Sequence, residues 1–401
     1  MKILSINDVP YGSTGNIMIN ISKTAENSIA AQTLCLYGKW TKKTTETNTI
    51  KSFGHTYENV FSKIVHLFTG YHNVCSYFGA KNLIRTIDNF KPDIIHLHNL
   101  HHCVHNLPIL FKYIKKNNIK VVWTLHDCWT FTGKCPYFDV ANCNKWKTGC
   151  YSCPQVKAYP KSYVDRTKTM YRLKKKWFTG INDLTIVTPS QWLAGLVKQS
   201  FLSEYPVNVI NNGINLDMFK PTENNFREKY NIPKDKFIVL GVAFGWGYRK
   251  GLDVFIELSK RLPDKYQIVL VGTDDKTDMQ LPNNIISIHR TQNQVELAEI
   301  YSAADIFTNP TREDNFPTTN IESLACGTPV ITFNTGGSPE IIDKSCGSVV
   351  DYNNIDKFEK EIIKVLAEES YTLENCVKRA EKFNMYDKFK EYVDLYGRNS
   401  N

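Results

Sequence analysis

The sequence predicts an α/β protein built from two Rossmann-like, doubly wound domains. Short apolar runs of strand length alternate with longer amphipathic segments, a pattern typical of a parallel sheet with helices on both faces. The pattern occurs twice and is interrupted between Asn211 and Pro221, where Asn, Gly and Pro gather and indicate a linker. A length of 401 residues suits two domains of ordinary size.

Strands are expected at the apolar runs of each half. In the first half these are Ile3–Ile6, Ile94–His98, Val121–Leu125 and Leu184–Thr188. In the second half they are Phe237–Val242, Tyr266–Val271, Ile285–Ile288, Asp305–Thr308 and Pro329–Thr332. Helical periodicity separates the strands, as in Asp253–Arg261 and Val295–Ala304.

These elements predict an N-terminal domain over residues 1–212 and a C-terminal domain over residues 213–382. Residues 383–401 are expected to form a helix whose aromatic face packs back on the N-terminal domain. Doubly wound domains bind their ligands at the carboxyl ends of the strands. Two such sheets facing each other would therefore line one cleft with both sets of strand ends.

Composition and charge narrow the class of protein. The chain has no run of about 18 apolar residues, and Met1–Ile6 is expected to be a buried strand and not a signal peptide. We therefore expect a cytoplasmic protein. Residues 1–210 hold 26 Lys and Arg against 11 Asp and Glu, and the remainder holds 23 against 29. The basic N-terminal half indicates an anionic partner, such as nucleic acid, an acidic membrane or a phosphorylated lipid. The alternative is that these lysines are solvated on the surface and bind no partner.

The most informative motif follows a predicted strand and begins at Thr311. It contains Asp314 and Glu322, which are separated by seven residues. A helix is expected to begin at Pro317, since proline suits the first helical position, and to end at Gly327. The unpaired amides at the start of this helix would offer positive potential to a diphosphate.

Gly-rich loops follow the first predicted strand of each domain. The loop of the second domain contains Arg249 and Lys250, and a cation there would stabilise charge on a leaving diphosphate. The loop of the first domain contains Gly12 and Gly15, which let backbone amides approach a phosphate or a sugar closely. His126 ends another strand of the first domain.

Together these motifs resemble those of the retaining glycosyltransferases of family four, which have the GT-B fold. The resemblance covers most of the chain, including the Asn-Gly-Ile sequence of the linker at 212–214. It implies that Glu322 holds the ribose hydroxyls of a nucleotide, that Lys250 holds the diphosphate, and that Asp314 contacts the donor sugar. It places His126 near that sugar, and we choose His126 for the acceptor side.

The family usually has Glu where this chain has Asp314, so Glu313 is a second candidate for contact with the sugar. The predicted catalytic residues are His126, Lys250 and Asp314. His98, His101 and His102 are candidates for the same cleft, with buried structural histidines as the alternative. The predicted donor site comprises Gly12, Gly15, Arg249, Lys250, Glu313, Asp314, Asn315, Phe316, Pro317, Thr318 and Glu322.

Four cysteines gather in residues 135–153, namely Cys135, Cys143, Cys150 and Cys153. Four thiolates suit a closed tetrahedral zinc site, which would stabilise a loop that lacks a core. The insert resembles one found in a subgroup of the same family, where its role would be structural. The alternatives are four reduced thiols, or a redox pair at the last two cysteines.

Residues 163–178 combine aromatic side chains with six cations. This composition is typical of a helix that lies on an anionic membrane, and the alternative is a core-facing helix with a solvated basic side. The membrane interpretation would bring the N-terminal domain to the inner face of the cell membrane and suit a lipid-linked acceptor.

The leading hypothesis is transfer of a hexose from a UDP- or GDP-linked sugar to a glycan or lipid-linked acceptor with retention, in cell-surface polysaccharide synthesis. The resemblance implies that no catalytic metal is needed. The alternatives are a zinc-containing nucleic-acid-binding protein and a related GT-B epimerase or phosphorylase. A nucleic-acid-binding protein would leave Asp314 and Glu322 without a role, so no nucleic-acid partner is expected.

Overall fold

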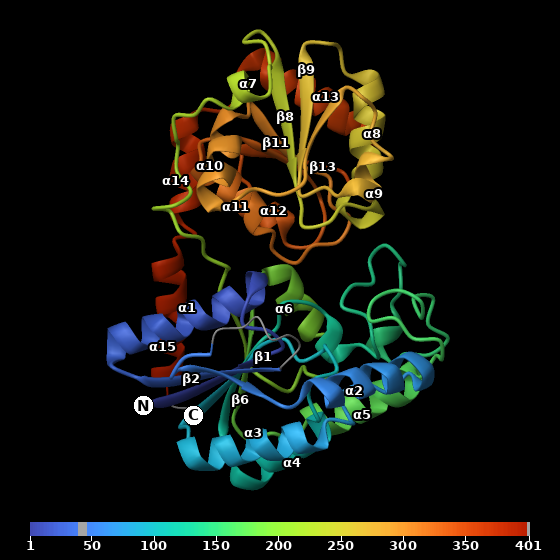
Figure 1. Cartoon of the computed structure of the whole chain (residues 1–401), viewed down its shortest axis with the longest axis vertical. Helices are drawn as coiled ribbons and strands as arrows, with labels where there is room; N and C mark the ends of the chain where they lie inside the picture. The colour runs from blue at the N-terminus through green and yellow to red at the C-terminus, as the bar shows by residue number, and fades with distance from the viewer. Residues whose placement is uncertain (39–45, 399–401) are drawn as a thin grey trace. The chain divides into compact units, whose positions relative to one another are not determined.

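The computed structural model describes residues 1–38 and 46–398, which form two compact units. The first unit comprises residues 1–211 and the segment from Lys388 onward, and the second comprises Asn212–Asp387. Each unit is a parallel sheet with helices on both of its faces (Figure 1). The predicted α/β class with two doubly wound domains is therefore confirmed.

The first unit contains a seven-stranded sheet in which all neighbouring strands are parallel. In hydrogen-bonding order its strands are β3 (Ile50–Phe53), β2 (Gln32–Gly38), β1 (Lys2–Asn7), β4 (Ile94–Leu97), β5 (Lys120–Thr124), β6 (Leu184–Thr188) and β7 (Val207–Val209). Its helices are α1 (Gly12–Ile29), α2 (Thr56–Thr69), α3 (Tyr77–Phe90), α4 (Leu107–Asn117), α5 (Thr167–Phe178) and α6 (Gln191–Val197), with short 3-10 turns η1 (Trp129–Phe131) and η2 (Lys145–Lys147).

The second unit contains a six-stranded parallel sheet. In hydrogen-bonding order its strands are β10 (Ile285–Ile288), β9 (Tyr266–Val271), β8 (Phe237–Val242), β11 (Ile306–Asn309), β12 (Val330–Phe333) and β13 (Gly347–Val350). Its helical segments are α7 (Phe226–Lys229), η3 (Tyr248–Lys250), α8 (Leu252–Arg261), α9 (Asp275–Asp278), α10 (Gln294–Ala303), α11 (Thr318–Ala325), α12 (Ser338–Ile341), α13 (Ile355–Glu368) and α14 (Leu373–Glu381).

The strands are nearly continuous apolar runs because both faces of each sheet are covered. In β8, for example, Ile238, Val239 and Leu240 are completely buried. All nine predicted strands are present, four with the predicted bounds and five that differ by one residue at one or both ends. Four further strands, β2, β3, β7 and β13, were not predicted.

The last helix, α15 (Met385–Gly397), begins in the second unit and continues in the first. Tyr396 Oη lies 2.7 Å from His96 Nδ1, and Thr124 Oγ1 lies 3.4 Å from Tyr392 Oη. Both tyrosines are buried against the first sheet. Of the predicted aromatic face, Phe383 instead packs in the second unit, and Tyr386 is exposed.

The structure corrects the membrane interpretation for the helical part of residues 163–178, whereas Tyr163 and Val164, which precede the helix, are exposed. The helix of this segment, α5, begins only at Thr167, and its apolar side chains Met170, Trp177 and Phe178 are buried in the core of the first unit. The core-facing alternative therefore holds for α5. Within the described residues, no helix combines the length and apolar character that crossing a membrane requires.

Candidate functional site

Two loops of the second unit meet at the carboxyl ends of β8 and β11. Lys250 Nζ lies 2.5 Å from Asp314 Oδ2, and Arg249 Nη1 donates to the Glu313 carbonyl oxygen at 2.9 Å. The amide of Arg312 also donates to the Arg249 carbonyl oxygen at 2.8 Å. The structure thus brings together the two predicted cations, the Asp314 carboxylate and the backbone of Glu313. In this state the cation and the carboxylate neutralise each other.

Gly251 lets these two loops approach closely. Its φ is +78°, and a Cβ atom at this position would lie 2.5 Å from the Pro310 carbonyl oxygen. Any larger residue would push the two loops apart, and Lys250 would then be drawn away from Asp314.

Arg312 anchors the same junction, although the sequence analysis did not single it out. Its guanidinium forms a fork with Asp253, at 2.7 and 2.8 Å, and donates to the Tyr248 carbonyl oxygen at 2.6 Å. It also lies over the Tyr248 ring, 3.8 Å from the centroid. A bidentate Arg–carboxylate pair fixes orientation as well as distance. The sequence offered one sign of this role, because Arg312 directly precedes two acids in the loop that follows β11.

The start of α11 differs by one residue from the prediction. Pro317 is the N-cap, with ψ at 111°, and Thr318 is the first helical residue. Proline has no side-chain acceptor, so the first-turn amides keep their positive potential. Asn315 and Pro317 are buried, and the Phe316 ring packs on Phe383 in the core, so the Phe316 side chain is not available to a ligand.

Glu322 projects from the second turn of α11. Tyr301 donates its hydroxyl to Glu322 Oε2 at 3.2 Å. Burial raises the pKa of the Glu322 carboxyl to about 7, because a low-dielectric environment disfavours its charged form. This carboxyl therefore changes its ionisation around neutral pH.

In the first unit, the loop after β1 is held close to the start of α1. A Cβ atom at Gly15 would lie 2.6 Å from the Pro10 carbonyl carbon, so only glycine fits there. Asn7 donates its side-chain amide to the Val9 carbonyl oxygen at 2.8 Å and to Thr14 Oγ1 at 3.2 Å. Gly12, the first residue of α1, has a positive φ of 71°.

His126 follows β5 and pairs with His98, which follows β4. The His98 Nδ1 and His126 Nε2 atoms are 3.1 Å apart, and the rings are stacked. Burial lowers the pKa of His126 to about 4 and holds the pKa of His98 well below its usual range. Both imidazoles are therefore neutral at pH 7 and can act as hydrogen-bond donors or acceptors.

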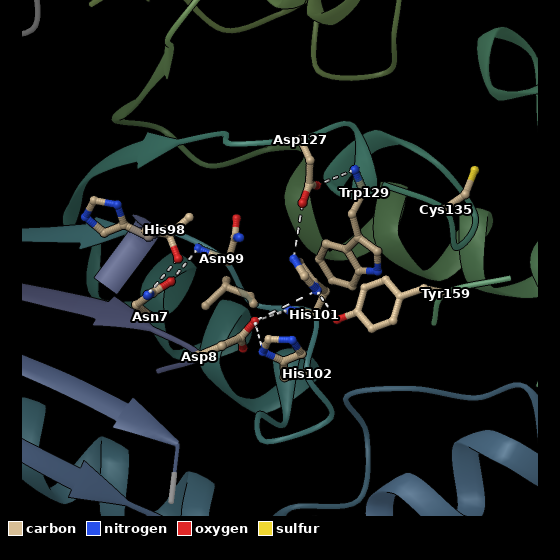
Figure 2. A network of polar contacts seen from close by, with 12 residues as sticks. Asn7, Asp8, His98, Asn99, His101, His102, Asp127, Trp129, Cys135 and Tyr159 are labelled. Atoms are coloured by element: carbon tan, nitrogen blue, oxygen red, sulfur yellow. Dashed lines mark hydrogen bonds and ion pairs between the residues drawn. The ribbon is translucent and has the colours of Figure 1, made fainter. Parts of the chain in front are cut away.

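A second polar cluster lies at the same end of this sheet (Figure 2). Asp8 is almost completely buried, and its carboxylate lies 2.8 Å from His105 Nε2 and 3.3 Å from His102 Nδ1. His101 lies between two acids, with Nε2 at 3.2 Å from Asp127 and Nδ1 at 4.0 Å from Asp8. Burial raises the pKa of Asp8, but the histidines lower it to about 2.

This cluster offers the spacing of a metal site. One ligand atom each from Asp8, His101 and His102 lie within 4.8 Å of one another. Tyr159 Oη, at 3.0 Å from His101 Nδ1, closes the group. The sequence analysis named the two histidines as candidates but missed Asp8 and Asp127, since a single acid after a strand carries no signal of its own.

The four predicted metal ligands gather around one small pocket of about 20 Å³. The Gly133 amide donates to Cys150 Sγ at 3.1 Å. A tetrahedral zinc site places its sulfurs about 4 Å apart. Among the described residues the sulfurs are more open, because no three of them lie within 4.8 Å of one another. The zinc site stays a prediction that requires the sulfurs to move together.

Two buried lysines lie beside this pocket. Lys174 donates to the carbonyl oxygens of Trp129 and Thr132 and lies over the Trp129 ring. Lys134 donates to three carbonyl oxygens between residues 155 and 158. Burial lowers the pKa of Lys174 to about 7 and that of Lys134 to about 8.

Comparison with known proteins covers both units. Residues 51–218 match the family described as Glycosyltransferase Family 4, and residues 222–383 match Glycosyl transferases group 1. The putative colanic acid biosynthesis glycosyl transferase WcaC of Escherichia coli K12 is 26% identical over 369 residues, which cover 88% of each chain. The O-antigen biosynthesis glycosyltransferase WclY of Escherichia coli is 30% identical over 36% of this chain and 42% of its own.

Solved structures share the fold. A sucrose-phosphate synthase from Thermosynechococcus elongatus has a TM-score of 0.73 with 17% identity, and 98% of each chain is covered. Anabaena HepE in complex with UDP has a TM-score of 0.68 with 14% identity, over 98% of this chain and 99% of its own. The two family matches together span most of the sequence, so the chain belongs to the GT-B glycosyltransferases of family 4 and group 1.

Proposed function

We propose that this glycosyltransferase moves a hexose from a UDP- or GDP-linked sugar to a glycan or lipid-linked acceptor, with retention at the anomeric carbon. The observation that carries the proposal is the junction of Lys250 and Asp314 in the same unit as Glu322. Relatives named for colanic acid and O-antigen biosynthesis, and HepE structures with UDP and UDP-glucose, support this donor and setting.

The donor diphosphate would bind to Lys250 and the first-turn amides of α11. Because Lys250 pairs with Asp314 in the free protein, a bound diphosphate would replace that carboxylate as the partner of the ammonium group. Asp314 would then be free to accept hydrogen bonds from the donor sugar, with Glu313 as the second candidate. Glu322 in its ionised form would accept hydrogen bonds from both ribose hydroxyls.

Cleavage of the sugar–phosphate bond builds negative charge on the leaving diphosphate. Lys250, Arg249 and the helix start would stabilise that charge, which is the task that a divalent cation performs in other enzymes. We therefore propose transfer without a catalytic metal. Front-side displacement would retain the configuration, with the leaving phosphate oxygen accepting the proton of the acceptor hydroxyl. Neutral His126 would orient the sugar or the acceptor by hydrogen bonding.

We also propose a structural zinc ion in the cysteine-rich insert. Zinc with four thiolates carries a net charge of about −2. The two buried ammonium groups of Lys134 and Lys174, which donate to backbone carbonyl oxygens, would compensate that charge. The ion would close the loop and would take no part in sugar transfer.

The test begins with thermal shifts of the intact protein in UDP, GDP, ADP and CMP and their common sugars. One nucleotide class should raise the melting temperature of the wild type but not of Glu322→Ala, while Glu374→Ala, at an exposed position, should respond like the wild type. NMR of the product formed from the selected donor should then show the anomeric configuration of the donor. Failure of every nucleotide at millimolar concentration, or an inverted product, would overturn the corresponding part of the proposal.

A further inference from the structure

Helix α2 of the first unit is amphipathic in the opposite sense to an ordinary surface helix. Besides Thr56 and Lys63, its exposed positions are apolar. These apolar residues have exposed fractions between 47% and 64% and are Tyr57, Val60, Phe61, Ile64 and Phe68. This spacing of three and four residues makes one continuous stripe along the helix. A stripe of this kind normally faces a core, and here it faces solvent.

The buried face of α2 is polar, and Glu58 and His66 on it contact other segments of the first unit. Glu58 accepts hydrogen bonds from the Phe78 and Gly79 amides, both at 2.8 Å, and so caps the start of α3. His66 Nε2 lies 3.4 Å from the Pro160 carbonyl oxygen. These contacts fix the rotation of the helix about its axis. The apolar stripe is therefore held outward by the structure and cannot turn in without exposing Glu58.

Neighbouring segments extend the stripe into a larger surface. Phe68 contacts Tyr163 with ring centroids 5.6 Å apart, and the Tyr163 amide donates to the Leu67 carbonyl oxygen at 2.8 Å. We call the α2 surface the set of exposed residues Tyr57, Val60, Phe61, Ile64, Phe68, Tyr77, Phe78, Tyr163 and Val164. Exposed apolar side chains gathered in this way mark an interaction site.

Lysines border the α2 surface. The Lys81 ammonium lies 4.6 Å from the centroid of the Tyr77 ring, and the Lys161 ammonium lies 5.3 Å from that of Tyr163. Both lysines, and Lys63 on α2 itself, are exposed. Aromatic and aliphatic side chains ringed by lysines match a bilayer interface, where the rings enter the headgroup region and the cations meet lipid phosphates.

We propose that the α2 surface binds the face of an anionic phospholipid membrane. Charge favours this occupant over a second copy of the chain. Residues 1–210 carry 26 Lys and Arg against 11 Asp and Glu, so a symmetric dimer through this surface would place lysines opposite lysines. An anionic bilayer offers the opposite charge together with an apolar interior.

This inference deepens the proposed use of a lipid-linked acceptor, because it would hold the acceptor-side domain at the layer where such an acceptor lies. It does not depend on the identity of the nucleotide sugar. If the protein binds vesicles but no donor, the proposed function is refuted and the proposal that the α2 surface binds membranes is still supported. If the protein binds a donor but no vesicles, only the membrane proposal is refuted.

The experiment is co-sedimentation of the full chain with vesicles of phosphatidylcholine, pure or mixed with phosphatidylglycerol. The wild type should bind the mixed vesicles, and Phe61→Ser combined with Phe68→Ser should lower the partition coefficient about tenfold or more. Both positions are exposed, so folding should be unchanged. Met279→Ser combined with Tyr386→Ser removes exposed apolar groups of the second unit and should bind like the wild type.

Lys81→Glu combined with Lys161→Glu should weaken binding to the mixed vesicles, and added salt should reduce this difference. Equal binding by wild type and the Phe61/Phe68 variant would overturn the proposal, and so would a wild type that ignores anionic vesicles. Light scattering then measures the oligomeric state of the wild type and of the Phe61/Phe68 variant. A wild-type dimer that the Phe61/Phe68 variant turns into a monomer, without any vesicle binding, would assign the surface to a second copy instead.

Discussion

The ionisation of Glu322 should make donor binding depend on pH in a defined direction. The pKa of this carboxyl is raised by burial to about 7, and only the ionised form can accept hydrogen bonds from two ribose hydroxyls. Below pH 7 the donor must displace a proton to bind. If binding requires the ionised form, the affinity should be about tenfold higher at pH 8 than at pH 6.

The groups around Glu322 do not interfere in this range. Burial raises the pKa of Tyr301, from α10, well above its ordinary value, and raises that of Cys326, directly after α11, to about 12. Neither of them titrates between pH 6 and 8. Because the folded pKa of Glu322 is raised, its contribution to the stability of the free protein falls as pH rises from about 4.5 to 7. Donor affinity and free-protein stability should therefore change in opposite directions.

Isothermal titration calorimetry with the nucleoside diphosphate sugar selected by thermal shift measures this effect, since such a sugar has no titrating phosphate near neutral pH. At pH 7, experiments in two buffers of different ionisation enthalpy should show release of about half a proton on binding. Glu322→Gln should bind about tenfold more weakly at pH 8 and should show no pH dependence. Wild-type affinity that stays constant or falls between pH 6 and 8 would refute the assignment of Glu322 to the ribose.

Three further outcomes concern the scaffold of the site. Arg312→Met should lower the free energy of unfolding of the second unit by about 2 kcal/mol in urea titrations, whereas Arg290→Met, at an exposed position, should leave it nearly unchanged. Gly15→Ala should lower the free energy of unfolding of the first unit by about 2 kcal/mol in urea titrations, because its methyl group overlaps the preceding loop; an unchanged midpoint would contradict that steric account. Elemental analysis of the purified protein should find one zinc per chain, lost in Cys150→Ser and kept in Cys75→Ser, and a metal-free wild type would exclude the zinc site.

The sequence was most informative where local pattern and tertiary environment agree. Central strands such as β8 were located because both faces are buried and their residues are apolar without interruption, and β9 contains a single polar residue, Gln267. The strands that were missed include the short edge strands β3, β7 and β13, which span only three or four residues. So few residues carry no readable period, and their pairing depends on the neighbouring strand.

The donor loops could be predicted because their chemistry is concentrated in short segments. Arg312 could not be assigned, because its role depends on Asp253, 59 positions away along the chain. The role of Asp8 could not be predicted either, because only the structure shows that three histidines from a distant loop surround its carboxylate. Helix α2 shows a different limit, because periodicity identifies an apolar stripe but does not tell which way it faces.

The return of α15 to the first sheet has a consequence for biosynthesis. His96 in β4 finds its hydroxyl partner in Tyr396, which is 300 positions later in the chain. A ribosome must therefore complete the whole second unit before the first can bury the last turns of this helix. During translation the first unit would remain incomplete, because the part of the sheet around His96 and Thr124 would lack the two tyrosines that cover it. A nonsense codon at the start of α15 would therefore impair the domain that was synthesised first.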